Sequence, residues 1–455
     1  MRTFQPLLLL PVAALVGCAQ VPTVPEPLAT DVPAQVTVSG ARGALSQRAA
    51  NAVLRQLAEE APDADALRRH LAVEQVIAGA PLYTGNRVTI LRDGPETFAA
   101  IFAAIRAARH YLYLEYYTFE EIQNGDERLS DLLIRRQGEG VHITVLYDSV
   151  GSIATPGELF ERLGAAGIRV CAFNPLNPLT GHFAINDRDH RKLLLADGQI
   201  AIIGGVNLST DYQSAPVGSG QPQAQPPWHD TDLRIEGPAV DELKHLFDEH
   251  WRQQGGDEDA LVPGDGDGAA QGDQVVRIVG SQAGGRLSPR YYATLVSSIR
   301  SAEASIDVTA AYFAPTRQES SALLRAARRG VRVRLLLPSQ SDSFPVLAVQ
   351  RSHYHSMLRA GIQIYERQDG ILHSKIVVAD GVWSIVGSSN FDHRSVLFND
   401  EIDAVVIGSQ TGQALESYLQ QDLQHAQRID AASWEHRPFG ERVRERFWRL
   451  WETLL

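Results

Sequence analysis

One pattern occurs twice in the chain, first as His190-Arg191-Lys192-Leu193-Leu194-Leu195-Ala196-Asp197 and again as His373-Ser374-Lys375-Ile376-Val377-Val378-Ala379-Asp380. Both copies read H-x-K-x-x-x-x-D. Each continues into a Gly-rich element that ends in an asparagine, Gly204-Gly205-Val206-Asn207 in the first copy and Gly387-Ser388-Ser389-Asn390 in the second. The doubled pattern predicts one site with two imidazoles, two ammonium groups and two amides. Such a set suits a phosphodiester, because ammonium and amide groups stabilise developing negative charge.

The spacing within each motif predicts its local structure. His190 and Lys192 are two residues apart, so on a strand they project from the same face. The apolar run that follows ends in Asp197-Gly198, and the second copy ends likewise in Asp380-Gly381; both are hairpin signals. Asp197 and Asp380 complete the catalytic motif, but at a turn remote from the His–Lys face. We therefore expect them to have a structural role, capping the turn or pairing a nearby base.

Two further carboxylates follow the asparagine elements at equivalent positions. When Gly237 is aligned with Gly408, Asp230 is matched with Glu401. A carboxylate that accepts a hydrogen bond from one imidazole nitrogen fixes the tautomer and raises the basicity of the other nitrogen. We expect Asp230 to orient His190 and Glu401 to orient His373. The alternative is that both are surface carboxylates at strand starts.

The duplication extends beyond the motifs and predicts the fold. Residues 140–146 (GVHITVL) are echoed by residues 330–336 (GVRVRLL), each after a helical pattern. Strands that alternate with helices indicate an α/β sandwich in each repeat, the two related by a pseudo-twofold axis with one active site at their interface. We expect lead-in helices at residues 41–80, the first repeat at 81–252, a Gly- and Asp-rich linker at 253–274 and the second repeat at 275–455. Residues 214–227 are an insertion in the first repeat only, expected to form a mobile loop beside the site.

The N-terminal residues predict export. Residues 1–17 have the features of a signal peptide, with Arg2 ahead of a short apolar stretch. They end in Leu15-Val16-Gly17-Cys18, which resembles the bacterial lipoprotein box, and the resemblance implies that Cys18 is lipidated. Residues 18–40 then form a Pro-rich tether. Ala19 resembles the sorting pattern for the outer membrane, which implies a lipid-anchored envelope protein facing the periplasm. A plain signal peptide or membrane anchor is the alternative.

Charge and ligand spacing limit the possible functions. The net charge is −12, which argues against a strongly basic nucleic-acid surface, so no nucleic acid is expected as a partner. No metal or other cofactor is expected, because the histidines lack further ligands at metal spacing and the adjacent lysines would repel a cation.

The C-terminal segment has an amphipathic pattern. Val443, Phe447, Trp451 and Leu454 lie along one helical stripe with arginines nearby. Packing of this stripe on the protein's own domain is the favoured interpretation, and a membrane interface is the alternative.

The doubled motif with its asparagine tails resembles the phospholipase D superfamily. Residues 387–395 (GSSNFDHRS), Asn399 and Glu401 are similar to the cardiolipin synthase branch, as are residues 147–152 (YDSVGS), 189–192 (DHRK) and 228–231 (WHDT). The resemblance covers roughly residues 80 to 455. It departs in one respect, because the commonest bacterial cardiolipin synthases carry N-terminal transmembrane helices.

The resemblance implies a chemistry and a substrate. His190 would attack phosphorus to form a phosphohistidine, and His373 would protonate the leaving alcohol and then deprotonate the acceptor. Lys192, Lys375, Asn207 and Asn390 would bind the non-bridging oxygens. The implied reaction of a monomeric enzyme is the condensation of phosphatidylglycerol with an alcohol acceptor, a second phosphatidylglycerol, to give cardiolipin. The alternatives are a hydrolytic phospholipase D, a nuclease of the same superfamily and an envelope-binding protein with a degenerate site.

Overall fold

The structure of the protein is a computed structural model that describes residues 21–24, 36–175, 186–213, 226–263, 268–283 and 290–454. The expected signal peptide with Cys18, much of the tether and nearly all of the insertion at residues 214–227 lie outside the described residues.

The first repeat is built on a mixed sheet. Its strands lie in the order β8 (Arg169–Phe173), β7 (His142–Asp148), β4 (Tyr111–Tyr116), β10 (Lys192–Ala196), β11 (Ile200–Gly204), β13 (Thr231–Glu236) and β3 (Leu82–Arg92). The first three strands are parallel and the others antiparallel. Three helices cover one face, α3 (Asp93–Ala107), α4 (Leu129–Gly138) and α5 (Gly157–Ala165), and α6 (Ala239–Gln253) covers the other.

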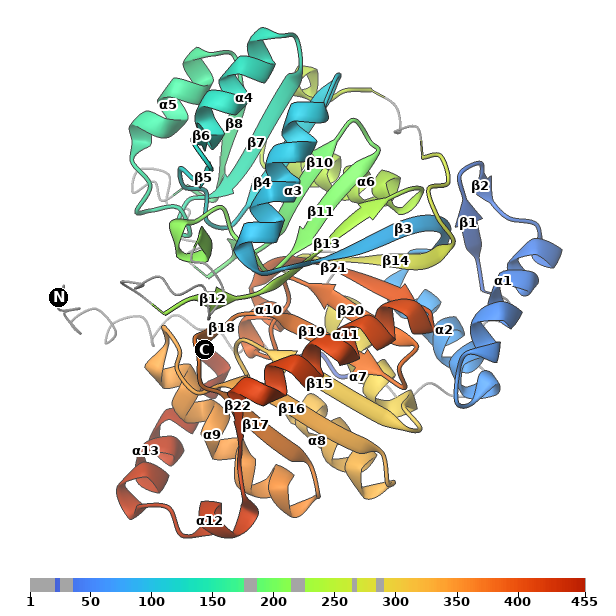
Figure 1. Cartoon of the computed structure of the whole chain (residues 1–455), viewed down its shortest axis with the longest axis vertical. Coiled ribbons are helices and arrows are strands. Elements are labelled where there is room, and N and C mark those ends of the chain that lie inside the picture. The colour runs from blue at the N-terminus through green and yellow to red at the C-terminus, as the bar shows by residue number, and fades with distance from the viewer. Residues whose placement is uncertain are drawn as a thin grey trace.

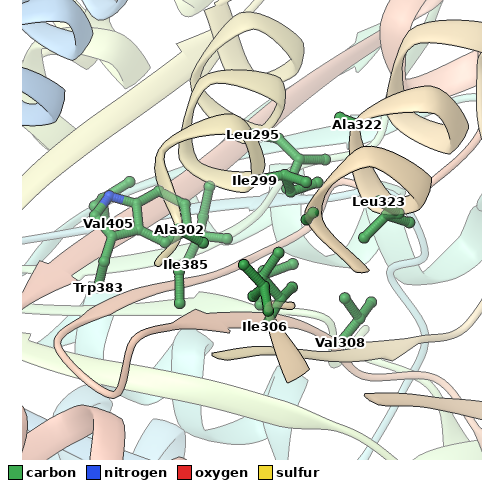
Figure 2. Packing of buried hydrophobic residues seen from close by; sticks show 14 of the residues in the cluster. Leu295, Ile299, Ala302, Ile306, Val308, Ala322, Leu323, Trp383, Ile385 and Val405 are labelled. Atoms are coloured by element: carbon green, nitrogen blue, oxygen red, sulfur yellow. The ribbon is translucent and has the colours of Figure 1, made fainter. Parts of the chain in front are cut away.

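The second repeat follows the same plan. Its strands lie in the order β22 (Ala426–Arg428), β17 (Gln363–Arg367), β16 (Arg332–Pro338), β15 (Ser305–Ala310), β19 (Lys375–Ala379), β20 (Trp383–Gly387), β21 (Asn399–Ile407) and β14 (Gln274–Ser281). The helices α7 (Arg290–Ser301), α8 (Arg317–Arg328) and α9 (Phe344–Arg359) pack on one face, as Figure 2 shows for α7 and α8. The other face is covered by α11 (Ser409–Asp422).

The two sheets are joined by β3 and β14, the strands that begin each repeat along the chain. β3 pairs with β14, so hydrogen bonding runs on from one repeat into the other. Between them lies a shared core, in which Leu243 and Phe247 of α6 cluster with Ile278 of β14 and Val406 of β21. The predicted fold class is confirmed: two α/β repeats lie one above the other with a common interface (Figure 1).

The helices that precede the first repeat pack on the second. α1 (Gln47–Glu59) and α2 (Ala64–Ala78) contribute Leu57 and Leu71 to the core around α7. Glu74 of α2 is fully buried, 2.7 Å from Nη1 of Arg277, and accepts a hydrogen bond of 2.7 Å from the Trp383 indole. β1 (Val38–Gly40) pairs with β3 and with β2 (Gly43–Ala44). The N-terminal segment therefore holds the second repeat against the first.

Short elements complete the fold. They are β5 (Gln123–Asn124), β6 (Glu127–Arg128), β9 (Arg188–Asp189), β12 (Trp228–His229), β18 (Ile371–Leu372), α10 (His393–Leu397), α12 (Ala431–Glu435), α13 (Phe439–Arg449) and the 3-10 turns η2 (Thr210–Gln213), η3 (Glu258–Ala260), η4 (Leu423–His425) and η5 (Glu452–Leu454). No helix in the described part of the chain is long and apolar enough to cross a membrane.

The C-terminal helix departs from expectation. α13 packs against α9, but Val443, Phe447 and Trp451 remain 49%, 53% and 38% exposed. The prediction that this stripe packs on its own domain is therefore wrong for Val443, Phe447 and Trp451, and Leu454 at its end is less exposed than they are.

Candidate active site

Each motif histidine is held by a segment of the other repeat. β9, which leads into His190, pairs with β21 of the second repeat, and the His190 backbone N–H donates to the Asp400 carbonyl at 2.9 Å. In the second motif, β18 pairs with β12 of the first repeat, and the His373 N–H donates to the His229 carbonyl at 2.7 Å. The motif strands β10 and β19 lie inside their own sheets, so only the residues ahead of them cross the interface.

This crossing reverses the expected pairing of histidines with carboxylates. Nδ1 of His190 lies 3.0 and 3.1 Å from the Glu401 carboxylate oxygens, and Nδ1 of His373 lies 2.6 Å from Oδ2 of Asp230. We expected Asp230 with His190 and Glu401 with His373, and that expectation is wrong. Because β12 and β21 each receive the histidine segment of the opposite repeat, the carboxylate beside each strand meets the other repeat's imidazole. All four residues are buried.

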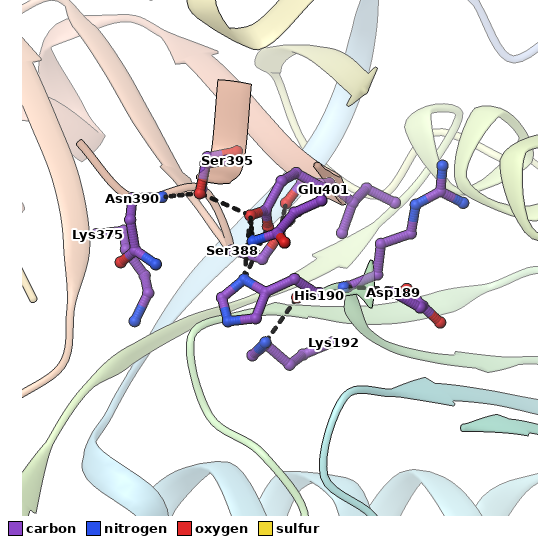
Figure 3. A network of polar contacts seen from close by, with 12 residues as sticks. Asp189, His190, Lys192, Lys375, Ser388, Asn390, Ser395 and Glu401 are labelled. Carbon is purple, nitrogen blue, oxygen red and sulfur yellow. Dashed lines mark hydrogen bonds and ion pairs between the residues drawn. The ribbon is translucent and has the colours of Figure 1, made fainter. Parts of the chain in front are cut away.

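Glu401 is held in place by further donors (Figure 3). Ser388 Oγ and Ser395 Oγ donate to it at 2.5 and 2.8 Å, and Asn399 Nδ2 donates at 3.2 Å. Burial raises the pKa of Glu401 to about 7, although Lys192 and the serine donors oppose the shift. The three donors therefore support a carboxylate that burial alone would neutralise.

The surroundings of the two histidines lower both pKa values, and that of His190 further. Burial, followed by the charges of Lys192 and Lys375, holds the pKa of His190 well below its ordinary value. Burial and Lys375 also lower the pKa of His373, but Asp230 opposes them. An unprotonated imidazole has a nitrogen free to act as a nucleophile, which suits His190, whereas Asp230 opposes the lowering of the His373 pKa.

Each motif lysine contacts the histidine of its own motif. Lys192 Nζ donates to the His190 carbonyl at 2.6 Å, and Lys375 Nζ lies 2.8 Å from Nδ1 of His373. Burial lowers the pKa of Lys192 to about 7 and lowers that of Lys375. An ammonium group in such a place gains most from an anionic ligand, because a phosphate would restore the charge that burial disfavours.

The two asparagine elements lie beside the histidines, and Asn207 and Asn390 line the cleft between the repeats. Asn207 Oδ1 accepts from the Thr118 N–H at 3.2 Å, and its amide donates to the Tyr212 hydroxyl at 3.3 Å. Asn390 Oδ1 is buried without a hydrogen-bond partner among the described residues. The preceding glycines are needed for close approach: a Cβ on Gly205 would lie 2.1 Å from Asp230 Oδ1, and one on Gly387 2.1 Å from Asp403 Oδ1.

The motif aspartates lie at hairpin turns. Asp197 accepts backbone hydrogen bonds from Arg109, His110 and Tyr111 at 2.7–2.9 Å. Asp380 makes the equivalent bonds with residues 303–305 at 2.7–3.2 Å. Both have a φ of 54°, and the glycine after each also has a positive φ, as in a type I′ turn. Each aspartate therefore ties its turn to the start of a neighbouring strand, β4 or β15.

The histidines open into a cleft of about 500 Å³ between the repeats. Its walls include residues without a motif signal, among them Tyr212, whose hydroxyl lies 3.0 Å from Nδ1 of His373, and Tyr117, whose ring lies edge-on to His190 and 5.3 Å from Lys192 Nζ. Tyr212 belongs to the single turn η2, directly after the asparagine element, and its place could be found only from the fold. Arg188 and Arg394 bring guanidinium groups to the same cleft.

One buried group has donors of the kind that bind metals. Single ligand atoms of Glu115, Asp189 and His250 lie within 4.8 Å of one another. Burial and Arg191 lower the pKa of His250, but Glu115 and Asp400 outweigh them and raise it to about 10. Nδ1 of His250 lies 2.5 Å from Glu115, and Arg191 Nη1 lies 3.3 Å from the same carboxylate. The group is therefore an ion-pair network that fixes the segment around His190.

Comparison with known proteins agrees with this geometry. The family described as "Cardiolipin synthase, PLD-like domain" matches residues 101–216 and 295–423, one stretch in each repeat. The chain is 33% identical to the cardiolipin synthase of Geobacillus thermodenitrificans over 85% of its length and 75% of that protein's. It is 33% identical to cardiolipin synthase A of Pseudomonas syringae, over 78% and 72% of the two chains. The structure resembles the phosphatidylserine synthase of Haemophilus influenzae with a TM-score of 0.66 at 13% identity, covering 86% of this chain and all of that one, which shows a common fold.

These observations define a phospholipase D-type phosphatidyltransferase with one site formed by two H-x-K-x-x-x-x-D repeats. The chain belongs to the cardiolipin synthase family of phospholipase D-like proteins.

Proposed function

We propose that the protein condenses two molecules of phosphatidylglycerol into cardiolipin and glycerol through a covalent phosphohistidine. The observation that carries the proposal is the cross-repeat pair of His–carboxylate dyads, His190–Glu401 and His373–Asp230, which open into one cleft. The names of the cardiolipin synthases that share about a third of their residues with this chain support the choice of substrate.

The first half of the reaction uses the difference between the two dyads. His190, neutral and with Nδ1 turned to Glu401, attacks phosphorus through Nε2. The P–O bond to the glycerol headgroup breaks, and His373, its proton favoured by Asp230, donates that proton to the leaving alkoxide. Lys192, Lys375, Asn207 and Asn390 stabilise the phosphoryl oxygens.

The second half returns the phosphatidyl group to an alcohol. His373 takes the proton from the hydroxyl of a second phosphatidylglycerol, whose oxygen attacks phosphorus while the P–Nε2 bond breaks. Cardiolipin forms and His190 is regenerated, so atoms and protons balance without a cofactor. Hydrolysis differs only in that water replaces the second lipid.

The proposal includes the location of the enzyme in the cell envelope. Members of this family act on membrane phospholipid, and acylation of Cys18 would hold the catalytic repeats of a monomer at the periplasmic face of the outer membrane. The support for the anchor is the sequence Leu15-Val16-Gly17-Cys18 and the proline-rich residues behind it.

The proposal is tested by incubating the purified protein with phosphatidylglycerol vesicles and measuring cardiolipin and glycerol by mass spectrometry. Equal amounts of both products are expected, and none with His190→Ala. Cleavage of DNA with no lipid product would replace the proposal with the nuclease alternative.

A further inference from the structure

The apolar residues of α13 lie on its exposed side, whereas an ordinary surface helix buries its apolar side. The covered side of α13 carries Glu445, which is 6% exposed and lies 2.7 Å from Arg437, and Trp448, which packs on Phe344 of α9. The apolar residues lie on the open side: Phe439, Val443, Phe447 and Leu450 are 77%, 49%, 53% and 79% exposed. Spacings of three and four residues put these four side chains in one stripe along the helix.

Basic residues flank the stripe. Arg442, Arg446 and Arg449 each directly precede an apolar member of the stripe and lie along its edge. α13 contains four arginines against two glutamates, although the whole chain has a net charge of −12. An apolar stripe bordered by arginine is typical of a helix that lies in the interface of an anionic membrane.

The helix leads directly to the mouth of the active site. α13 runs into η5, where Glu452 lies 2.5 Å from His353 of α9 and Leu454 lines the catalytic cleft. Figure 1 shows α13 on the outer side of α9, with the C-terminus brought back toward the junction of the repeats. In the first repeat, Ile153 is 71% exposed two residues after Gly151, which lines the same cleft. An exposed apolar side chain of the first repeat thus lies close to the cleft, and the residues that follow α13 in the second repeat reach the cleft through Leu454.

We propose that α13 docks on the surface of an anionic phospholipid bilayer and thereby places the mouth of the cleft against its lipid substrate. The arginine border selects a lipid surface over an apolar protein groove, because phosphate headgroups supply the matching charge along the whole stripe. The inference rests on the proposed function, which makes a bilayer lipid the substrate.

A fluorescent probe tests the contact itself. The full-length chain is prepared with Cys18→Ser and Cys171→Ser, and an environment-sensitive fluorophore is attached at Val443→Cys. The control is Val76→Cys, which is 62% exposed, on the helix α2, which lies on the other side of the molecule from α13 in Figure 1. With vesicles of phosphatidylglycerol and phosphatidylethanolamine we expect a blue shift at residue 443 and none at residue 76. No shift at residue 443, or equal shifts at both, overturns the proposal. A shift that grows with protein concentration in the absence of vesicles assigns the stripe to a second copy and overturns it too.

A second experiment links docking to turnover. Phe447→Asp combined with Leu450→Asp is compared with Val76→Asp on two substrates, phosphatidylglycerol vesicles and a short-chain phosphatidylglycerol dispersed as monomers. The double variant should lose about tenfold or more of its rate on vesicles and keep the wild-type rate on monomers. Equal loss on both substrates, or no loss on either, contradicts the proposal. If the wild-type protein makes no product from either substrate the proposed function fails, whereas the fluorescence result still decides the docking.

Discussion

Nδ1 of His190 lies 3.0 Å from Oε2 of Glu401, a residue 211 positions later in the chain and in the other repeat. The reciprocal contact joins His373 to Asp230. Neither repeat can therefore orient its own catalytic histidine, and the single site exists only because both repeats pack together.

The two dyads should respond differently to a better leaving group. Asp230→Asn mis-orients the acid, so turnover of phosphatidylglycerol should fall by about 10²–10⁴. A phosphatidyl ester of p-nitrophenol needs little protonation, and its initial burst of p-nitrophenol should be largely restored in this variant. Glu401→Gln impairs the nucleophile and should lose a similar factor with both substrates. Restoration in Glu401→Gln and not in Asp230→Asn would exchange the roles of the two histidines.

The nucleophile can also be located directly. With the activated ester, His373→Ala should still accumulate a phosphoryl group on His190, and His190→Ala should accumulate none. Peptide mapping after quenching at alkaline pH identifies the modified residue. A phosphoryl group on His373 would contradict the assignment.

The motif aspartates should affect stability more than chemistry. Asp197→Asn and Asp380→Asn keep a side chain that tolerates positive φ but lose the charge that accepts several backbone hydrogen bonds. We expect each to lower the free energy of unfolding by about 1–3 kcal/mol, since hydrogen bonds to charged groups are the stronger ones. Turnover well below the melting temperature should stay within about a few-fold of the wild type. Thermal unfolding and kcat, measured together, check this, and a stable but inactive variant would show that the turn role is wrong.

Lys192 should govern both activity and stability as the pH rises. Its pKa is about 7, against 10.5 for an ordinary lysine, so the free enzyme loses this charge above about pH 7. If the ammonium group binds phosphate, kcat/KM should decrease above that pH. A profile that stays level through that range would contradict the role.

The same shift has a consequence for folding. Between about pH 7 and 10.5 the unfolded chain binds a proton at Lys192 that the folded chain does not, so this residue makes stability increase with pH across that window. Lys192→Met removes the cost of the buried charge. We expect a higher melting temperature than wild type below pH 7, with a difference that shrinks toward pH 10.5. A lower melting temperature at all pH values would show that the lysine stabilises the fold.

The anchor is tested in cells. Cys18→Ser should leave the protein unacylated and reduce cardiolipin made in the envelope, because a tethered enzyme stays near its lipid. Fractionation and lipid analysis measure both effects. An unchanged distribution and lipid content would remove Cys18 from the account.

The sequence predicted which residues form the site but not which of them contact one another. The repeated motif identified the histidines and asparagines that line the cleft and the lysines that contact the histidines, and the Asp-Gly pairs predicted the turns. It could not show which carboxylate meets which imidazole, because the choice depends on β9 pairing with β21 and β12 with β18 across the interface. The same limit applies to α13: a helical stripe shows which residues lie together, and only tertiary packing shows that this one faces outward.

Product analysis in water enriched with oxygen-18 distinguishes transfer of the phosphatidyl group to a lipid from its hydrolysis. With phosphatidylglycerol vesicles as the only lipid, mass spectrometry should find cardiolipin with unlabelled phosphates and free glycerol, because a lipid hydroxyl opens the phosphohistidine. Phosphatidic acid carrying one oxygen-18 as the main product would contradict the proposed transfer and make the protein a hydrolase.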